Sequence, residues 1–292
     1  MLTIIILTII ALSLGLLIFF VNKIVPTKVK GIEKTEEIAG ILPGMNCGAC
    51  GKPGCFAFAQ ALTEKPELMS EGRCTVAIQD EENVKALETV LGVTLNTSEM
   101  SKKALIHCNG NSEVIYNYSG IGTCKGAAQL LSGYKKCPYA CVGLGDCLVV
   151  CPQDAISIKL GNGMAVVDPK KCTGCGLCVP ECPLTIIELV PSGTKMAFLC
   201  NYIPLRDIPG REKCDAGCTH CRKCFNICKH EAITWNKERA IPVFDVEKCT
   251  LCQECIEVCP THTLAEMRIR EKVPALSLAG TTPDEHRNVP VS

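Results

Sequence analysis

The stretch "KCTGCGLCVPECP", Lys171–Pro183, places four cysteines within eleven residues. Three of them follow CxxCxxC spacing, which lets their thiolates bind three corners of one iron–sulfur cube. The fourth, Cys182, comes after a wider step and precedes Pro183, which fixes φ and turns the chain away. In the run C-x2-C-x2-C-x3-C-P, this fourth cysteine binds the other cluster of a pair. The stretch therefore predicts a partner string of cysteines elsewhere in the chain.

Cysteine dominates the composition, with 24 cysteines in 292 residues and only 4% aromatic residues. Disulfide scaffolds also reach such cysteine contents, but they are usually short and secreted. Here the cysteines are bunched at regular CxxC steps, which favours metal ligation over disulfide loops. The formal net charge of zero gives no indication of nucleic-acid binding. The length allows two or three small domains.

The amino-terminal segment differs in kind from the rest of the chain. Residues 2–21 carry no charge and are long enough to cross the hydrocarbon core as a helix, although a buried core helix is the alternative. A secretory signal peptide would place positive charge before a shorter apolar stretch and a cleavage site after it. Instead Lys23, Lys28 and Lys30 follow the segment. The positive-inside rule then predicts a single-pass protein of the cytoplasmic membrane, with its amino terminus outside and its cysteines in the reducing cytoplasm.

The cysteine-rich part of the chain is a duplicated module. The first half contains "KKCPYACVGLGDCLVVCPQDAI" and then the opening stretch, and the second contains "EKCDAGCTHCRKCFNICKHEAI" and then "KCTLCQECIEVCP". The matching segments "ALIHCN" and "MAFLCN" precede the two halves, and "DAISI" and "EAITW" are predicted strands. Helices are expected near residues 33–39 and over 79–91. The apolar face of the second helix comprises Val84, Leu87, Val90 and Leu91.

We therefore expect an α+β chain with one transmembrane helix, a small helical 4Fe–4S domain and two tandem bacterial-type ferredoxin-like modules, each built for two 4Fe–4S clusters. The expected segments are a transmembrane helix at 1–23, a juxtamembrane linker at 24–40, a 4Fe–4S domain at 41–100, ferredoxin-like modules at 101–190 and 191–269, and a disordered tail at 270–292.

Crossed ligation assigns the cysteines of each half to two sites. In the first half, one predicted set is Cys151, Cys172, Cys175 and Cys178. The other set is irregular, because regular spacing would place a cysteine at Leu144. Cys137 is the predicted substitute, which gives the set Cys137, Cys141, Cys147 and Cys182. The second half is regular and predicts one set of Cys218, Cys221, Cys224 and Cys259, and another of Cys228, Cys249, Cys252 and Cys255.

A fifth site precedes the repeat, at the cysteines Cys47, Cys50, Cys55 and Cys74. Structural zinc is the alternative at every site, but zinc prefers separated CxxC pairs to three consecutive steps that close with Cys-Pro. Four cysteines remain, namely Cys108, Cys124, Cys200 and Cys214. They either hold a sixth cluster between the halves or act as small buried apolar residues.

The apolar segment, the stretch "LPGMNCGACGKPGC" and the downstream cysteine strings together resemble the B subunit of the Rnf complex, in its long form with two ferredoxin-like modules. The resemblance extends from Leu2 to about Arg268. It implies a membrane ferredoxin:NAD+ oxidoreductase that couples electron flow to Na+ or H+ transport. In that family this subunit takes electrons from soluble reduced ferredoxin and passes them to the membrane and flavin-bearing subunits.

The residues favour an electron-transfer subunit over an independent enzyme. No GxGxxG follows a strand and no phosphate loop occurs, so we expect no flavin or nucleotide site in this chain. Two alternatives stay open: delivery of electrons to another membrane redox enzyme or redox sensor, and a non-redox scaffold in which the clusters only hold the fold. A basic patch for an acidic ferredoxin, or else ordinary solvated surface, comprises Lys135, Lys136, Lys170 and Lys171.

Overall fold

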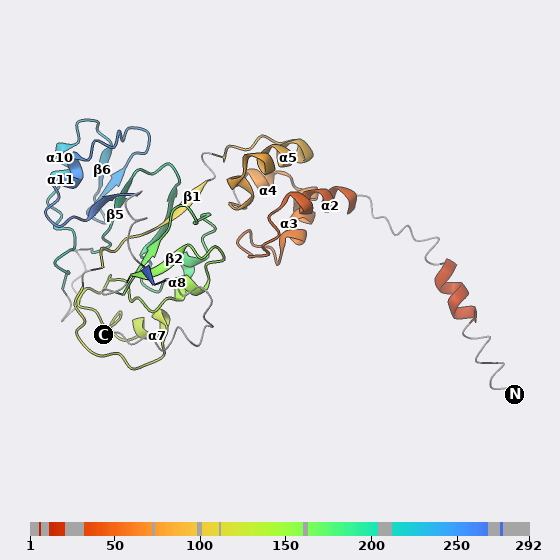
Figure 1. The fold of residues 1–292 in the computed structure, drawn as a ribbon, viewed down its shortest axis with the longest axis horizontal. Coiled ribbons are helices and arrows are strands. Elements are labelled where there is room, and N and C mark those ends of the chain that lie inside the picture. The colour runs from red at the N-terminus through yellow and green to blue at the C-terminus, as the bar shows by residue number, and fades with distance from the viewer. Residues whose placement is uncertain are drawn as a thin grey trace.

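The structure is a computed structural model that describes Ile6 and residues 12–20, 32–71, 74–97, 101–110, 112–159, 163–203, 212–267 and 275–276. Figure 1 shows a helical unit at one side and a strand-containing part at the other, so the expected mixture of helices and strands is confirmed.

The predicted transmembrane segment lies largely outside the described residues. Residues 12–20 are helical and exposed. Within the described part of the chain, no helix is both long enough and apolar enough to span a bilayer.

The helical unit packs around one apolar core. Its elements are α2 (Ile32–Ile41), α3 (Cys55–Glu64), α4 (Glu67–Ser70), the 3-10 turn η1 (Ala77–Gln79) and α5 (Glu81–Leu91). Asp80 begins α5 by accepting a hydrogen bond from the Glu82 backbone, and Gly92 ends it in the left-handed conformation, φ 71°. The core of the unit includes Ile38, Phe58, Leu62, Met69, Val84, Leu87 and Leu91. The expected helices at 33–39 and 79–91 are therefore confirmed, with Val90 at the edge of the core.

The first half of the repeat consists of two small antiparallel sheets and short helices. Its elements are β1 (Lys102–Ile106), α7 (Cys124–Ala128), α8 (Asp146–Val149), β2 (Ile156–Lys159), β3 (Met164–Val167), α9 (Cys178–Glu181) and β4 (Ile187–Pro191). The first strand pairs with the last, with Ile106 opposite Ile187, and the central strands form a hairpin with Ile156 opposite Val167. This pairing brings the two cysteine strings of the half together.

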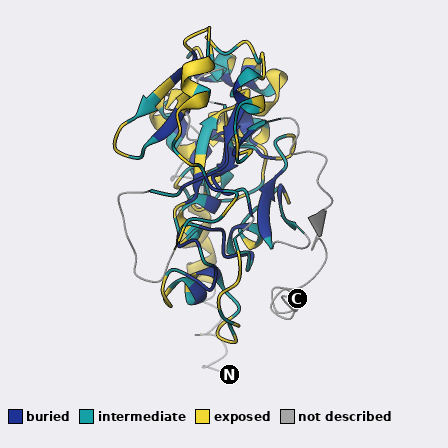
Figure 2. Cartoon of the chain, turned by 90° about the vertical axis from the view of Figure 1, so that its left-hand side faces the viewer, coloured by how far each residue is buried: buried dark blue, intermediate teal, exposed yellow. Residues whose placement is uncertain are grey.

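The second half repeats this connectivity. Its elements are β5 (Met196–Phe198), α10 (Lys223–Ile227), β6 (Ile233–Asn236), β7 (Ile241–Phe244), α11 (Glu254–Glu257) and β8 (Leu264–Glu266). Strand β5 pairs with β8 and β6 pairs with β7, so the strands predicted at "DAISI" and "EAITW" are confirmed as β2 and β6. Buried residues are dark blue in Figure 2, and strands β3 and β5 are buried throughout.

The two halves are joined through the outer sheets. Leu105 of β1 packs against Ala197 and Leu199 at β5, and all three side chains are buried. His107 Nδ1 lies 2.8 Å from the Phe198 carbonyl across the same interface. The halves therefore share a core in addition to their individual ones.

The carboxyl-terminal segment shows one difference from the expected disordered tail. Strand β9 (Ala275–Leu276) pairs with β2, with Leu276 opposite Ile158, although the rest of 270–292 lies outside the described residues.

Candidate iron–sulfur sites

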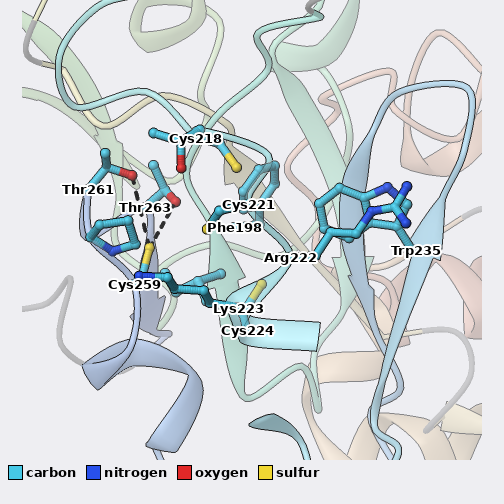
Figure 3. A pocket seen from close by; sticks show the side chains of 13 residues that line it. Phe198, Cys218, Cys221, Arg222, Lys223, Cys224, Trp235, Cys259, Thr261 and Thr263 are labelled. Atoms are coloured by element: carbon cyan, nitrogen blue, oxygen red, sulfur yellow. Dashed lines mark hydrogen bonds between the residues drawn. The ribbon is translucent and has the colours of Figure 1, made fainter. Parts of the chain in front are cut away.

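The second half presents a hollow lined by one complete predicted set, Cys218, Cys221, Cys224 and Cys259 (Figure 3). The empty space in this hollow is about 320 Å³. Arg222 and Trp235 stand at its rim, where the guanidinium lies 5.1 Å from the ring centroid. Four thiols around one hollow are the arrangement that a 4Fe–4S cube requires.

Two threonine hydroxyls approach a ligand sulfur at this site. Thr263 is 1% exposed and its hydroxyl lies 3.4 Å from the Cys259 sulfur, while the Thr261 hydroxyl lies 4.0 Å away. Burial raises the pKa of Cys259, but hydrogen bonds from Thr261 and Thr263 outweigh this effect, so that the pKa is lowered. These donors stabilise negative charge on the sulfur.

The second set of this half lines another hollow. Its cysteines, Cys228, Cys249, Cys252 and Cys255, surround about 360 Å³ of empty space. The pKa of Cys255 is raised to about 11, first by burial and then by the charges of the three other cysteines. Both predicted sets of the regular half are thus brought together.

The backbone of both cysteine loops is shaped to face an anion. Four residues that separate the ligands adopt left-handed φ between 56° and 66°, namely His220, Arg222, Leu251 and Gln253. The first half uses glycine at the equivalent positions, Gly143, Gly145, Gly174 and Gly176. In these loops, residues in the left-handed conformation alternate with other residues. This alternation turns successive backbone N–H groups toward one side of the loop, as in anion-binding nests.

The helical unit carries the set predicted from Cys47, Cys50, Cys55 and Cys74, which lines a hollow of about 390 Å³. Asn46 holds the loop by accepting a hydrogen bond of 2.8 Å from the Cys55 backbone. Thr75 lines the same hollow, and its buried hydroxyl has no hydrogen-bond partner among the described residues. An unpaired buried hydroxyl beside four thiols fits a ligand that accepts hydrogen bonds.

In the first half, the set of Cys151, Cys172, Cys175 and Cys178 is also brought together. The pKa of Cys178 is raised to about 12, first by burial and then by the charges of the other three cysteines. The Cys172 sulfur accepts the Ala104 N–H at 3.4 Å, and the Cys151 sulfur accepts the Ala155 N–H at 3.3 Å. Backbone hydrogen bonds to ligand sulfurs are typical of iron–sulfur sites.

The irregular set of the first half has a further cysteine close to it. Burial raises the pKa of Cys147 strongly, and the thiols whose charges raise it further include Cys141, Cys124 and Cys182. Cys124 thus lies close to Cys147, while Cys137 and Cys214 lie close enough for each to shift the pKa of the other.

The helical unit contacts the first half close to a ligand set. Gln153 Nε2 donates to the Met45 sulfur at 2.9 Å, although the two residues are far apart in the sequence. Burial raises the pKa of Cys175, and among the charges that raise it further is that of Cys47. Two of the predicted ligand sets are therefore neighbours.

The candidate docking lysines divide into two groups. Lys170 and Lys171 are exposed, whereas Lys136 pairs with Glu212 at 3.1 Å. Lys135 is only 7% exposed, so it cannot be part of a solvated patch. It lies beside Cys141. Burial raises the pKa of Cys141 to about 12, and the positive charge of Lys135 opposes this increase.

These observations test whether the residues fit 4Fe–4S clusters. Thiols converge on common hollows, backbone N–H groups and hydroxyls reach the sulfurs, and an unpaired hydroxyl faces one hollow. Among the described residues, no three His, Cys, Asp or Glu side chains are grouped as ligands of a single metal ion. A cube needs a wider spread, because each thiolate binds a different iron. The residues fit.

Comparison with known proteins gives the same assignment. Residues 140–186 and 217–263 match the family described as "4Fe-4S dicluster domain", and residues 42–71 match the one described as "Putative Fe-S cluster". The fold and sites thus define an iron–sulfur protein of the polyferredoxin class, in which a helical unit precedes two ferredoxin-like modules.

Curated relatives narrow this class. The chain is 33% identical to the B subunit of the Na+-translocating ferredoxin:NAD+ oxidoreductase complex of Acetobacterium woodii, over 85% of this chain and 74% of the relative. It is 31% identical to the B subunit of the ion-translocating oxidoreductase complex of Methanosarcina acetivorans, over 86% and 92%. It is 32% identical to the B subunit of the proton-translocating ferredoxin:NAD+ oxidoreductase complex of Clostridium ljungdahlii, over 89% and 90%. The chain belongs to this family, the B subunits of Rnf-type ion-translocating oxidoreductase complexes.

Proposed function

We propose that this chain takes electrons from reduced ferredoxin and passes them to partner subunits of an Rnf-type complex that reduces NAD+ and moves Na+ or H+ across the membrane. The observation that carries the proposal is the convergence of Cys218, Cys221, Cys224 and Cys259 on one hollow, repeated at two other ligand sets. The complexes to which the relatives belong suggest the donor, the acceptor and the coupling.

The chain's own residues have three tasks in this function. A bound 4Fe–4S cluster supplies one-electron transfer. The cysteines hold it as thiolates, the burial of residues such as Cys255 (9% exposed) keeps water away, and N–H and O–H donors adjust how much negative charge each site tolerates. Differences in these donors give the sites different potentials.

The amino-terminal segment would anchor the subunit. Residues 2–21 are uncharged and Lys23, Lys28 and Lys30 follow, which supports a single helix with the cysteine-rich part in the cytoplasm. The test is extraction of membranes with carbonate, followed by labelling of a cysteine introduced before residue 2 with an impermeant reagent. Retention in the membrane and labelling from outside are expected. Release by carbonate would contradict the anchor, and labelling only after permeabilisation would contradict the orientation.

Electron transfer is tested by mixing the oxidised full-length chain anaerobically with reduced ferredoxin. The visible absorption of the chain should bleach after mixing and should recover when the partner subunits and NAD+ are added. Replacement of a ligand, Cys252→Ala, should reduce the bleaching, whereas replacement of the exposed Lys237 by alanine should leave it unchanged. No bleaching of an iron-replete chain would contradict the proposal and favour a scaffold.

A further inference from the structure

Four cysteines of the two halves occupy matching positions at the interface between them. Cys108 follows β1 and Cys200 follows β5, at the ends of the matching "ALIHC" and "MAFLC" segments. Cys137 and Cys214 each precede the first cysteine of their string, Cys141 or Cys218, by four residues. The repeat therefore supplies two cysteines from each half.

The same hydrogen bond recurs in both halves. The Cys108 sulfur accepts the backbone N–H of Cys141 at 3.4 Å, and the Cys200 sulfur accepts that of Cys218 at 3.3 Å. Cys108 is 8% exposed and Cys200 is 6% exposed. These two sulfurs thus belong to buried cysteines, and they accept backbone N–H hydrogen bonds as the sulfurs of the assigned ligands Cys172 and Cys151 do.

The remaining pair meets across the interface. The thiols of Cys137 and Cys214 lie close enough for each to shift the pKa of the other, and the charge of Cys200 also acts on Cys137. Adjacent contacts hold the halves in this position. They are the Lys136–Glu212 ion pair at 3.1 Å and the edge-to-face contact of Tyr139 with Tyr202, whose ring centroids are 5.9 Å apart.

Cys124 belongs elsewhere. Its backbone N–H donates to Asp146 Oδ1 at 2.9 Å, and its thiol lies close enough to the backbone of Leu144, Gly145 and Asp146 for these groups to oppose the rise that burial causes in its pKa. Leu144 is the position at which regular spacing requires a cysteine, and Cys221 is its counterpart in the second half. The Cys124 sulfur therefore reaches the place of the missing ligand.

The sequence supports this exchange. Cys108 and Cys137 are 29 positions apart, whereas their counterparts Cys200 and Cys214 are 14 positions apart. The first half thus has an additional segment, and Cys124 lies in it. The half that has no cysteine at position 144 thus has an additional one in its own longer segment.

We infer that the chain holds six 4Fe–4S clusters and that the ligands of two differ from those expected by spacing. One set is Cys124, Cys141, Cys147 and Cys182. The other is a bridging site between the halves, formed by Cys108, Cys137, Cys200 and Cys214. This inference rests on the proposed function for the kind of cofactor, and it accounts for all 24 cysteines as six sets of four.

The test counts iron and acid-labile sulfide in the anaerobically purified full-length chain and in matched variants. The wild type should contain about 24 iron atoms, and the variant Cys200→Ala/Cys214→Ala about 20, because the bridging site is lost. In this double variant, the further change Cys137→Ala should remove no more iron. The further change Cys124→Ala should remove more, because it takes a ligand from an intact site.

The two triple variants are matched controls for folding. Each adds one truncation at a buried cysteine, 9% exposed at Cys124 and 5% at Cys137, to the same background. Additional iron loss with Cys137→Ala and none with Cys124→Ala would overturn the assignment. A wild-type chain with about 20 iron atoms, and the same number in the double variant, would overturn the bridging cluster. One zinc ion at this site, or a disulfide between Cys137 and Cys214, would overturn it as well. In those cases ferredoxin would still reduce the other sites, so the proposed function would stand.

Discussion

The hydroxyl of Thr263 should raise the reduction potential of the site formed by Cys218, Cys221, Cys224 and Cys259. The hydroxyl lies 3.4 Å from the Cys259 sulfur and is buried. Reduction adds negative charge to the site, so a donor to a ligand sulfur stabilises the reduced form more than the oxidised one. Thr263→Val keeps the shape of the side chain and removes this donor, and the potential should fall.

The size of the fall follows from the strength of the bond. A hydrogen bond to a charged acceptor contributes about 1.5 kcal/mol at the lower end of its range. If the whole bond formed only on reduction, its loss would lower a one-electron potential by roughly 65 mV, at about 59 mV per tenfold change. Because the bond exists in both states, a third of this value is a reasonable lower limit. We expect a decrease of roughly 20–65 mV.

The assay is a redox titration of the full-length chain followed by low-temperature electron paramagnetic resonance. The repeat supplies a matched control, because the counterpart of Thr263 in the first half is Ile186, which is 2% exposed and has no hydroxyl. Ile186→Val should leave all potentials unchanged within error. An unchanged or higher potential in an iron-replete Thr263→Val chain would refute the reasoning that this hydroxyl stabilises the reduced site.

Three further predictions follow from other parts of the chain. Gly143→Ala should destabilise the first half more than Gly145→Ala. Both glycines have φ near 90° (89° and 88°), which costs alanine about 1–2 kcal/mol. At Gly143 a Cβ would also clash with the backbone carbonyl of Gly163, just before β3, whereas at Gly145 the space is open. Denaturation curves that coincide for the two variants would contradict this. Leu87→Ala should lower the free energy of unfolding of the helical unit by about 2–5 kcal/mol, because Leu87 is 0% exposed; a loss under about 1 kcal/mol would contradict the packing. In the iron-free chain, the exposed Cys221 should be alkylated before Cys224, because burial raises the pKa of Cys224 to about 12. Iron must displace the thiol protons to bind, so reconstitution of the clusters should improve as the pH rises. Equal alkylation rates at the two cysteines would indicate that the iron-free chain is unfolded.

The regular parts of the site could be predicted from spacing alone. In the second half, CxxCxxC strings and a distant fourth cysteine gave two sets that the structure gathers around separate hollows. Short loops leave the chain little freedom, so neighbours in sequence become neighbours around a ligand. The apolar face of α5 was predictable for the same reason, since Val84, Leu87 and Leu91 recur at the helical period.

The irregular set could not be predicted in this way, because spacing is informative only for residues on one short loop. Cys124 reaches the Leu144 backbone from an insertion, and Cys137 meets Cys214 of the other half. Contacts between the halves, such as the packing of Leu105 against Ala197 and Leu199, bring the second pair together. A signal was nevertheless present, since the longer first half has one additional cysteine, Cys124, and has Leu144 where the second half has Cys221.

Burial of charge was also invisible in the sequence. Lys135 and Lys136 are adjacent, yet Lys135 is 7% exposed beside Cys141 while Lys136 reaches Glu212 of the other half. The backbone of Lys135 pairs with that of Val114 in an isolated antiparallel β-bridge. Val114 lies in the same inserted segment as Cys124. Tertiary contacts with the inserted segment and with the other half thus surround these two lysines, and the order of residues does not reveal such contacts.

The most direct test of the account is the amount of iron, zinc and acid-labile sulfide per chain after anaerobic purification. An iron–sulfur electron-transfer subunit with every cysteine in a cluster predicts about 24 iron atoms, a matching amount of sulfide and little zinc. Substantial zinc with little sulfide would mean that the cysteines hold structural ions, and it would contradict electron transfer through this chain.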